Sequence, residues 1–293
     1  MNYSIYIFIF LSFQLISVPS LEEYDRLTLP YFLPTQIDVS SSKNQFLTAL
    51  GTHHTNDPQD PQFKPVIDAW NRFITAIPSK KNISVVIENP SGRACRHYQT
   101  SEEAIEHDCD RGLATYFAQQ HHATLIGAEL PTESVIAQLF NEFDHDLVLY
   151  FCFAQALLYW HDFNKHETSQ KDFVMNYVHQ WTKQTHITFE DLVALHKKLT
   201  GKSFRSHSVF FKNIMNLEHH NSFLKSLFSI FSKPIKRFKK DFHTLLKRSH
   251  QIRDQHIFNV IKAEWNKGNH VFIVYGAFHT IALESALQEL AQQ

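Results

Sequence analysis

The chain has 293 residues, 43% of them hydrophobic and 19% charged, which is enough apolar material for one or two packed domains and excludes a disordered chain. Its 28 basic and 29 acidic side chains leave a formal net charge of −1, so we expect no nucleic acid partner. The three cysteines form no C-x-x-C pair, which excludes a disulfide scaffold and a zinc ribbon. The seven glycines form no G-x-G-x-x-G, P-loop or G-x-S-x-G pattern, which disfavours dinucleotide-binding proteins, P-loop NTPases and ordinary α/β-hydrolases.

The N-terminal segment is apolar and uncharged. Residues 1–21 carry no charged side chain and residues 5–11 are purely apolar, but this run is too short for a membrane span of about 20 residues. We expect residues 1–20 to be a signal peptide with cleavage after Ser20, and the protein to be exported to the periplasm or secreted. The alternative interpretation is a buried first strand.

Short apolar runs alternate with helical patterns along the rest of the chain. Buried strands are predicted at residues 46–50, 83–87, 123–126 and 271–275. Helices are predicted at residues 61–77, 100–120, 133–161, 171–183, 189–199, 239–267 and around 283–290. This order predicts an α/β fold, with a mostly parallel sheet, flanking helices and a large helical insertion between the third and fourth core strands. The predicted boundaries are residues 21–130 and 239–293 for the two parts of the α/β core and 131–238 for the insertion or cap.

Chemically active side chains follow the predicted strands. The first and fourth strands are each followed by Gly, two residues, His and Thr, which places His54 and His279 at equivalent positions. The second strand ends at Glu88 and the third at Glu129. Because ligands bind beyond the carboxyl ends of parallel strands, we expect these two histidines and two glutamates to converge at one edge of the sheet. Glu129 has an alternative interpretation as a helix cap or a surface residue.

A cation on the helix before the last strand is a further candidate. Arg253 shares the apolar stripe of its predicted helix with Leu246, Ile257 and Val260. It either extends to the rim of the molecule or reaches into the site, with Asp254 beside it. The burial of Glu88 after an apolar strand would be costly without a partner, which a metal ion or Arg253 could supply.

The two G-x-x-H motifs, the strand that ends in Glu88 and the Arg-Asp helix before the last strand resemble the TIKI/TraB/GumN superfamily, which is related to the erythromycin-esterase and ChaN-like proteins. The resemblance covers residues 46–129 and 249–293. It implies metal-dependent hydrolysis, with His54, Glu88 and His279 as the site and Arg253 as a supporting cation. Some members of the wider group are esterases or membrane-associated proteases, and others bind haem. The tandem histidines of the first motif make His53 a competitor for the role of His54.

Two imidazoles and a carboxylate with open positions are a usual ligand set for a catalytic divalent metal such as Zn, Mn, Co or Fe. In this interpretation Glu88 either binds the metal or acts as the general base, and the substrate is a peptide or an ester. A metal-free version would use His54 or His279 as the base, oriented by Glu88. The alternatives are a non-catalytic haem- or metal-binding protein of the ChaN-like type and a degenerate family member that serves as an interaction module.

The segment 225–250 is basic and rich in phenylalanine. One interpretation is weak contact with an anionic membrane surface, although Pro234 would break a continuous helix. The other interpretation, which we favour, is an amphipathic helix whose phenylalanine face packs on the core.

Overall fold

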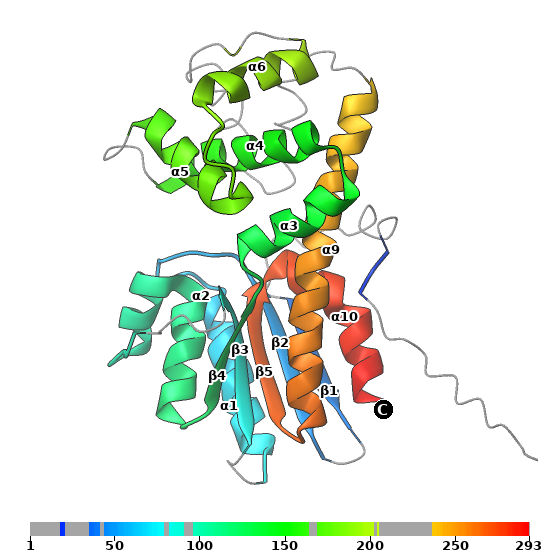
Figure 1. The fold of residues 1–293 in the computed structure, drawn as a ribbon. Helices are drawn as coiled ribbons and strands as arrows, with labels where there is room; N and C mark the ends of the chain where they lie inside the picture. The colour runs from blue at the N-terminus through cyan, green and yellow to red at the C-terminus, as the bar shows by residue number, and fades with distance from the viewer. Residues whose placement is uncertain are drawn as a thin grey trace, which may run out of the picture.

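In the computed structural model, residues 18–20, 35–41, 44–78, 82–90, 96–163, 169–201, 204 and 236–292 are described. They form an α/β fold around one five-stranded sheet with the strand order β1-β2-β5-β3-β4 (Figure 1). The strands are β1 (Thr35–Ser40), β2 (Phe46–Thr52), β3 (Ile83–Pro90), β4 (Thr124–Glu129) and β5 (His270–Gly276). All neighbouring pairs are parallel except β1 and β2. The predicted fold class, with its mostly parallel sheet and flanking helices, is confirmed.

The prediction missed one strand, the antiparallel edge strand β1. Its sequence, TQIDVS, contains no apolar run, and only Ile37 is buried within it. Alternation of polar and apolar residues is typical of a strand with one solvated face, whereas the four predicted strands are apolar on both faces. The hydrogen bond from Thr48 Oγ1 of β2 to Asp38 Oδ1 of β1, at 2.7 Å, adds to the pairing of these strands.

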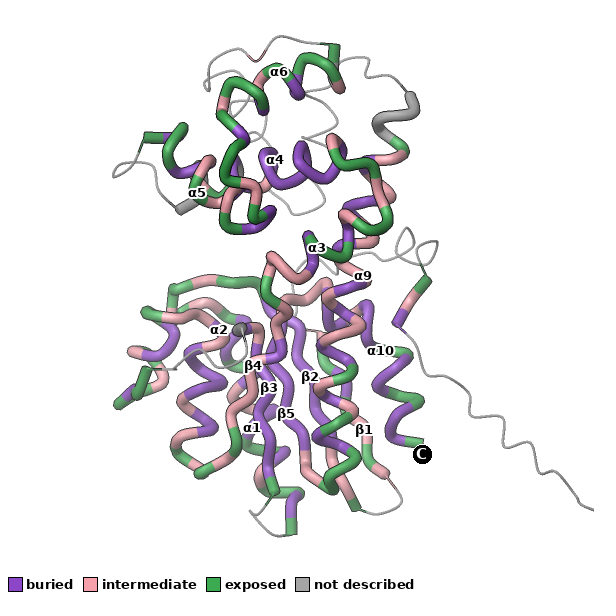
Figure 2. Tube along the Cα trace, in the orientation of Figure 1, coloured by how far each residue is buried: buried purple, intermediate pink, exposed green. Residues whose placement is uncertain are grey.

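Helices cover both faces of the sheet, and the strand side chains alternate between them. Helices α1 (Phe63–Ala76) and α2 (Ser101–Gln120) pack on one face against Val85, Ile87 and Val274. Helices α9 (Lys236–Asn266) and α10 (Ala277–Ala291) pack on the other face against Val86 and Ile273. Figure 2 shows the buried residues concentrated on the central strands and on the inner sides of these helices. Each face thus has its own hydrophobic core.

A third hydrophobic cluster stands over the carboxyl ends of the strands (Figure 1). It is formed by α3 (Thr132–Glu142), α4 (His145–Phe163), α5 (Gln170–Thr182) and α6 (Phe189–Thr200), which lie between β4 and α9 in the chain. The first half of α9 also belongs to this cluster through Phe242, Leu245 and Leu246, while the second half packs on the sheet. The helix α9 therefore links the two parts. The predicted extent of the insertion, 131–238, stays a prediction because residues 205–235 lie outside the described residues.

The prediction of one continuous helix over residues 133–161 is wrong, because the segment forms the two helices α3 and α4. The backbone is extended at Phe143, with φ −125° and ψ 161°. Asp144 Oδ1 then accepts hydrogen bonds from the N–H groups of Asp146 at 3.0 Å and Leu147 at 3.3 Å. A side-chain oxygen that accepts from the first helical N–H groups is a typical helix start, so Asp144 begins α4 in a new direction.

Two predictions fall partly on residues that the structure does not describe. Residues 1–17 of the expected signal peptide are among these, while Val18 is buried and the Pro19 carbonyl accepts a hydrogen bond from Gln251 Nε2 at 3.0 Å. Residues 225–235 of the basic segment are outside as well, whereas Phe242 packs in the helical cluster. Within the described ranges, no helix has the length and apolar character needed to span a membrane.

Candidate functional site

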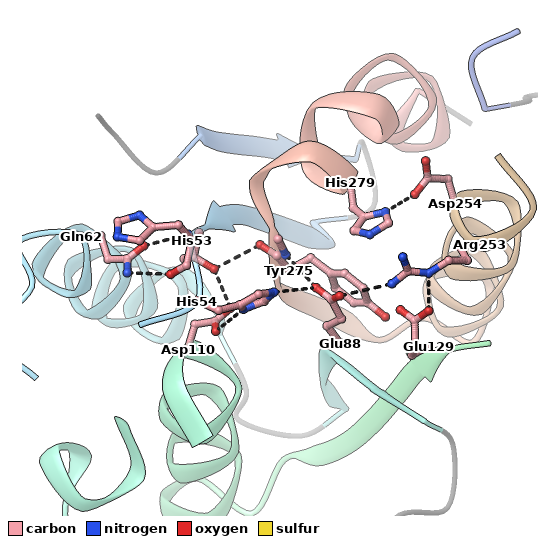
Figure 3. A network of polar contacts seen from close by, with 12 residues as sticks. His53, His54, Gln62, Glu88, Asp110, Glu129, Arg253, Asp254, Tyr275 and His279 are labelled. Atoms are coloured by element: carbon pink, nitrogen blue, oxygen red, sulfur yellow. Dashed lines mark hydrogen bonds and ion pairs between the residues drawn. The ribbon is translucent and has the colours of Figure 1, made fainter. Parts of the chain in front are cut away.

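The predicted site residues lie together beyond the carboxyl ends of the strands (Figure 3). The strand ends are adjacent, since Thr52 of β2 pairs with Gly276 of β5, which also neighbours β3. Gly276 marks the point of convergence. A Cβ atom added there would lie 3.2 Å from Glu88 Oε2, 3.6 Å from His54 Nε2 and 3.8 Å from His279 Cδ2. Since Gly276 has an ordinary φ of −54°, glycine is needed here for space and not for backbone conformation.

The first imidazole, His54, contacts two carboxylates. Its Nδ1 lies 2.8 Å from Asp110 Oδ1, and its Nε2 lies 3.4 Å from Glu88 Oε2. Because a buried carboxylate only accepts hydrogen bonds, Nδ1 carries the proton that joins it to Asp110. Asp110 is in turn held by Thr52 Oγ1, which donates to its Oδ2 at 2.6 Å. The hydrogen bonds to Asp110 and then to Glu88 raise the pKa of His54 to about 10, against the opposing effect of burial.

Asp110 is the site residue that sequence reasoning missed. It is completely buried, and it lies on α2 just after a break at Asp108 and Cys109, where Cys109 adopts φ 56° and ψ −141°. Gly112 allows the two parts of α2 to approach, since a Cβ there would lie 1.9 Å from the Ala104 carbonyl oxygen. One signal was present in the sequence: Asp110 shares a helical stripe with the buried Leu113, three residues later. A carboxylate on an apolar stripe requires a partner.

Glu88 lies at the centre of the polar network. Its Oε2 accepts a hydrogen bond from the Gly276 N–H at 3.1 Å, and its Oε1 lies 3.3 Å from Arg253 Nη2. Burial by itself raises the pKa of this carboxyl. The hydrogen bond from His54 and the charges of His279, His54 and Arg253 outweigh burial and hold the pKa of Glu88 well below its usual range. Glu88 is therefore ionised, with three partners around its two oxygens.

Arg253 reaches into the site from α9, as one of the two interpretations of the sequence expected. Its Nε donates to Glu129 Oε1 at 2.5 Å, so Glu129 belongs to the network and is not a surface residue. Burial lowers the pKa of the guanidinium, but Glu129 and Glu88 reverse this effect and the pKa of Arg253 is raised. Arg253 thus joins the ends of β3 and β4 through Glu88 and Glu129. Its positive charge offsets the free-energy cost of burying these two carboxylates.

The second imidazole, His279, repeats the arrangement of the first. Its Nδ1 is hydrogen-bonded to Asp254 Oδ1, and the side chains are 7% and 0% exposed. Burial lowers the pKa of His279, but Asp254 outweighs this effect and the pKa is raised. In the expected metal-free mechanism Glu88 oriented the histidines, whereas in the structure Asp110 and Asp254 hold the Nδ1 atoms.

His53, the competitor for the role of His54, faces away from Glu88 (Figure 3). Its Nε2 lies 3.1 Å from Asp60 Oδ2, and its side chain is 68% exposed. The Gln62 side chain fixes the His53 backbone in this position, because it accepts from the His53 N–H at 2.9 Å and donates to the His53 carbonyl at 2.8 Å. The structure therefore brings His54, and not His53, to the strand edge.

The donor types at this edge fit a divalent metal, although the side chains are not grouped as ligands. Among the described residues, no three His, Cys, Asp or Glu side chains lie close enough together to hold a metal ion. The fit is chemical: metal-binding histidines usually donate their other ring N–H to a carboxylate, and both His54 and His279 do so. That one metal ion is bound by both His279 and Glu88 is a proposal.

Comparisons of the chain with protein-family models, with curated proteins and with solved structures return no match. The interpretation of the site therefore depends on its own geometry and chemistry.

Proposed function

We propose that this chain is a metal-dependent hydrolase that cleaves a peptide or ester bond, with His54, Glu88 and His279 as metal ligands. The observation that carries the proposal is the pair of buried aspartates behind the two imidazoles. Asp110 and Asp254 each accept a hydrogen bond from an Nδ1 atom, which leaves the Nε2 atoms as the ones available for a metal. The resemblance of the two G-x-x-H motifs and Glu88 to the TIKI/TraB/GumN superfamily supports the same assignment.

A divalent cation such as Zn, Mn, Co or Fe, once bound, would polarise the substrate carbonyl and lower the pKa of a bound water. Glu88 suits the role of a ligand better than that of a general base, because its strongly lowered pKa makes it a poor proton acceptor. Arg253 holds Glu88 and Glu129 in place through its two ion pairs.

A metal-free mechanism fits the site less well. A general base must be unprotonated at the working pH, but the pKa of His54 is about 10 in the absence of metal. His279 also has a raised pKa. His54 would therefore carry an extra proton near neutral pH, and a divalent cation would replace this proton on Nε2.

The test is to measure metal content and affinity in four alanine variants. We expect the wild-type protein to bind about one equivalent of Zn²⁺ or Mn²⁺ in calorimetry and elemental analysis, as a mononuclear site requires. His54→Ala, Glu88→Ala and His279→Ala should lose this binding and the hydrolytic activity while their circular dichroism stays native. His53→Ala is the matched control and should keep both, because His53 faces Asp60. Wild-type metal content in all three site variants would overturn the proposal.

A further inference from the structure

The hydroxyl of Thr52 lies between two hydrogen-bond acceptors at the carboxyl end of β2. Thr52 and Asp110 are buried, so bulk water does not compete for their polar atoms. The Oγ1 atom of Thr52 lies 2.6 Å from Asp110 Oδ2 and 3.2 Å from the carbonyl oxygen of Tyr275. A hydroxyl has one proton to donate, and a charged acceptor at this short distance makes the stronger bond. Thr52 therefore donates to Asp110.

Asp110 in this way receives a hydrogen bond at each of its oxygens from one short segment of the chain. His54 Nδ1 donates to Oδ1 at 2.8 Å, and Thr52 Oγ1 donates to Oδ2. The two donors together fix the rotation of the carboxylate. Without the Thr52 hydroxyl, one oxygen of a buried carboxylate would lose this donor, which is costly. The carboxylate would then shift, and the hydrogen-bonded His54 ring would shift with it.

The Thr52 hydroxyl also closes a ring of polar contacts around His54. The peptide group between Tyr275 and Gly276 presents its carbonyl oxygen to Thr52, and its N–H donates to Glu88 Oε2 at 3.1 Å. This Glu88 oxygen lies 3.4 Å from His54 Nε2 (Figure 3). The position of the His54 ring is therefore set at both of its nitrogens, and Thr52 connects the two sides.

We propose that Thr52 is a positioning residue, which acts through Asp110 to hold the His54 ring with Nε2 directed at the bound metal. This inference rests on the proposed function, since the metal is the group that Nε2 would bind. The hydroxyl contributes one buried hydrogen bond to the arrangement. A single hydrogen bond corresponds to roughly a 2- to 12-fold change in an equilibrium constant.

The experiment measures Zn²⁺ affinity by competition calorimetry in variants that differ by one hydroxyl. Thr52→Val removes the hydroxyl and keeps the shape of the side chain, so we expect Zn²⁺ binding to weaken roughly 2- to 12-fold. Thr52→Ser keeps the hydroxyl and should keep the affinity. The matched control is Thr48→Val on the same strand. It removes an equivalent bond, from Thr48 Oγ1 to Asp38 Oδ1 at 2.7 Å, and should leave the affinity unaltered.

A double variant tests whether Thr52 acts through Asp110. In Asp110→Asn, the Thr52 hydroxyl would hold the amide oxygen on its own side and leave the NH₂ group towards His54. Without the hydroxyl, the amide can turn its oxygen to the Nδ1 proton of His54. Addition of Thr52→Val to Asp110→Asn should therefore cause no further loss of Zn²⁺ affinity.

The outcomes separate this inference from the proposed function. Circular dichroism would show which variants fold, and Thr52→Ala would replace a Thr52→Val protein that did not. Wild-type affinity without the hydroxyl, or an equal loss in Thr52→Ser or Thr48→Val, would refute the role of Thr52 while the metal site stands. A full additional loss in the double variant would refute action through Asp110. If the wild type binds no Zn²⁺, both the metal site and this inference fail.

Discussion

Replacement of Asp110 by asparagine isolates the role of the carboxylate behind His54. The amide has nearly the same size, and its oxygen can still accept from Thr52. Its NH₂ group, however, would face His54 Nδ1, which would then have to accept a hydrogen bond and pass its proton to Nε2. An Nε2 atom that carries the proton has no lone pair for a metal. The change therefore reverses the tautomer of His54 without removing the ring.

Loss of such an outer hydrogen bond typically lowers metal affinity about 10- to 100-fold, or about 1.4 to 2.7 kcal/mol. We expect Asp110→Asn to weaken Zn²⁺ binding by this amount in competition calorimetry. The matched control is Asp60→Asn, the same change beside His53, which should leave the affinity unaltered. Circular dichroism would show whether both variants fold. Unchanged Zn²⁺ affinity in a folded Asp110→Asn protein would refute the role of Asp110.

Two further predictions concern stability. Cys109 adopts φ 56° and ψ −141°, a region that favours glycine. Cys109→Gly should therefore have a free energy of unfolding about 1 kcal/mol higher than Cys109→Ala in urea denaturation. Equal stability of the two variants would show that the backbone is not strained at this position. In metal-free protein the pKa of His54 is raised from 6.5 to about 10, so its proton stabilises the fold fully below pH 6.5 and this contribution is lost as the pH rises through about 10. The urea concentration at the unfolding midpoint should therefore decrease as the pH rises from 7 to 10 in the wild type, and should decrease less in Asp110→Asn. The same decrease in both proteins would show that the His54–Asp110 pair is not its cause.

The site residues at the carboxyl ends of the strands could be predicted because they directly follow apolar runs in the sequence. A run such as residues 271–275 identifies a buried strand, and the parallel order then brings the next polar residues, His54, Glu88 and His279, to one edge. The edge strand β1 could not be found in this way, because an edge strand with one solvated face needs few apolar residues.

Asp254 and Asp110 differ in whether the sequence alone could identify them as site residues. Asp254 could be named because it adjoins Arg253, which was already a candidate. Asp110 depends on the break in α2 at Asp108 and Cys109, and neither residue type is a helix breaker like proline. The break is explained by the tertiary hydrogen bonds of Asp110 to His54 and Thr52, and Gly112 leaves room for the two parts of α2 to approach. Contacts between segments that are far apart in the sequence leave little trace in local periodicity.

The central position of β5 has a consequence for biosynthesis. This strand lies between β2 and β3, yet it is the last of the five to leave the ribosome. A nascent chain that has not reached residue 270 has two separate strand pairs with exposed edges. It also lacks His279 and Gly276, around which His54 and Glu88 gather. The sheet and the candidate site are thus completed together, so a truncated translation product would have neither.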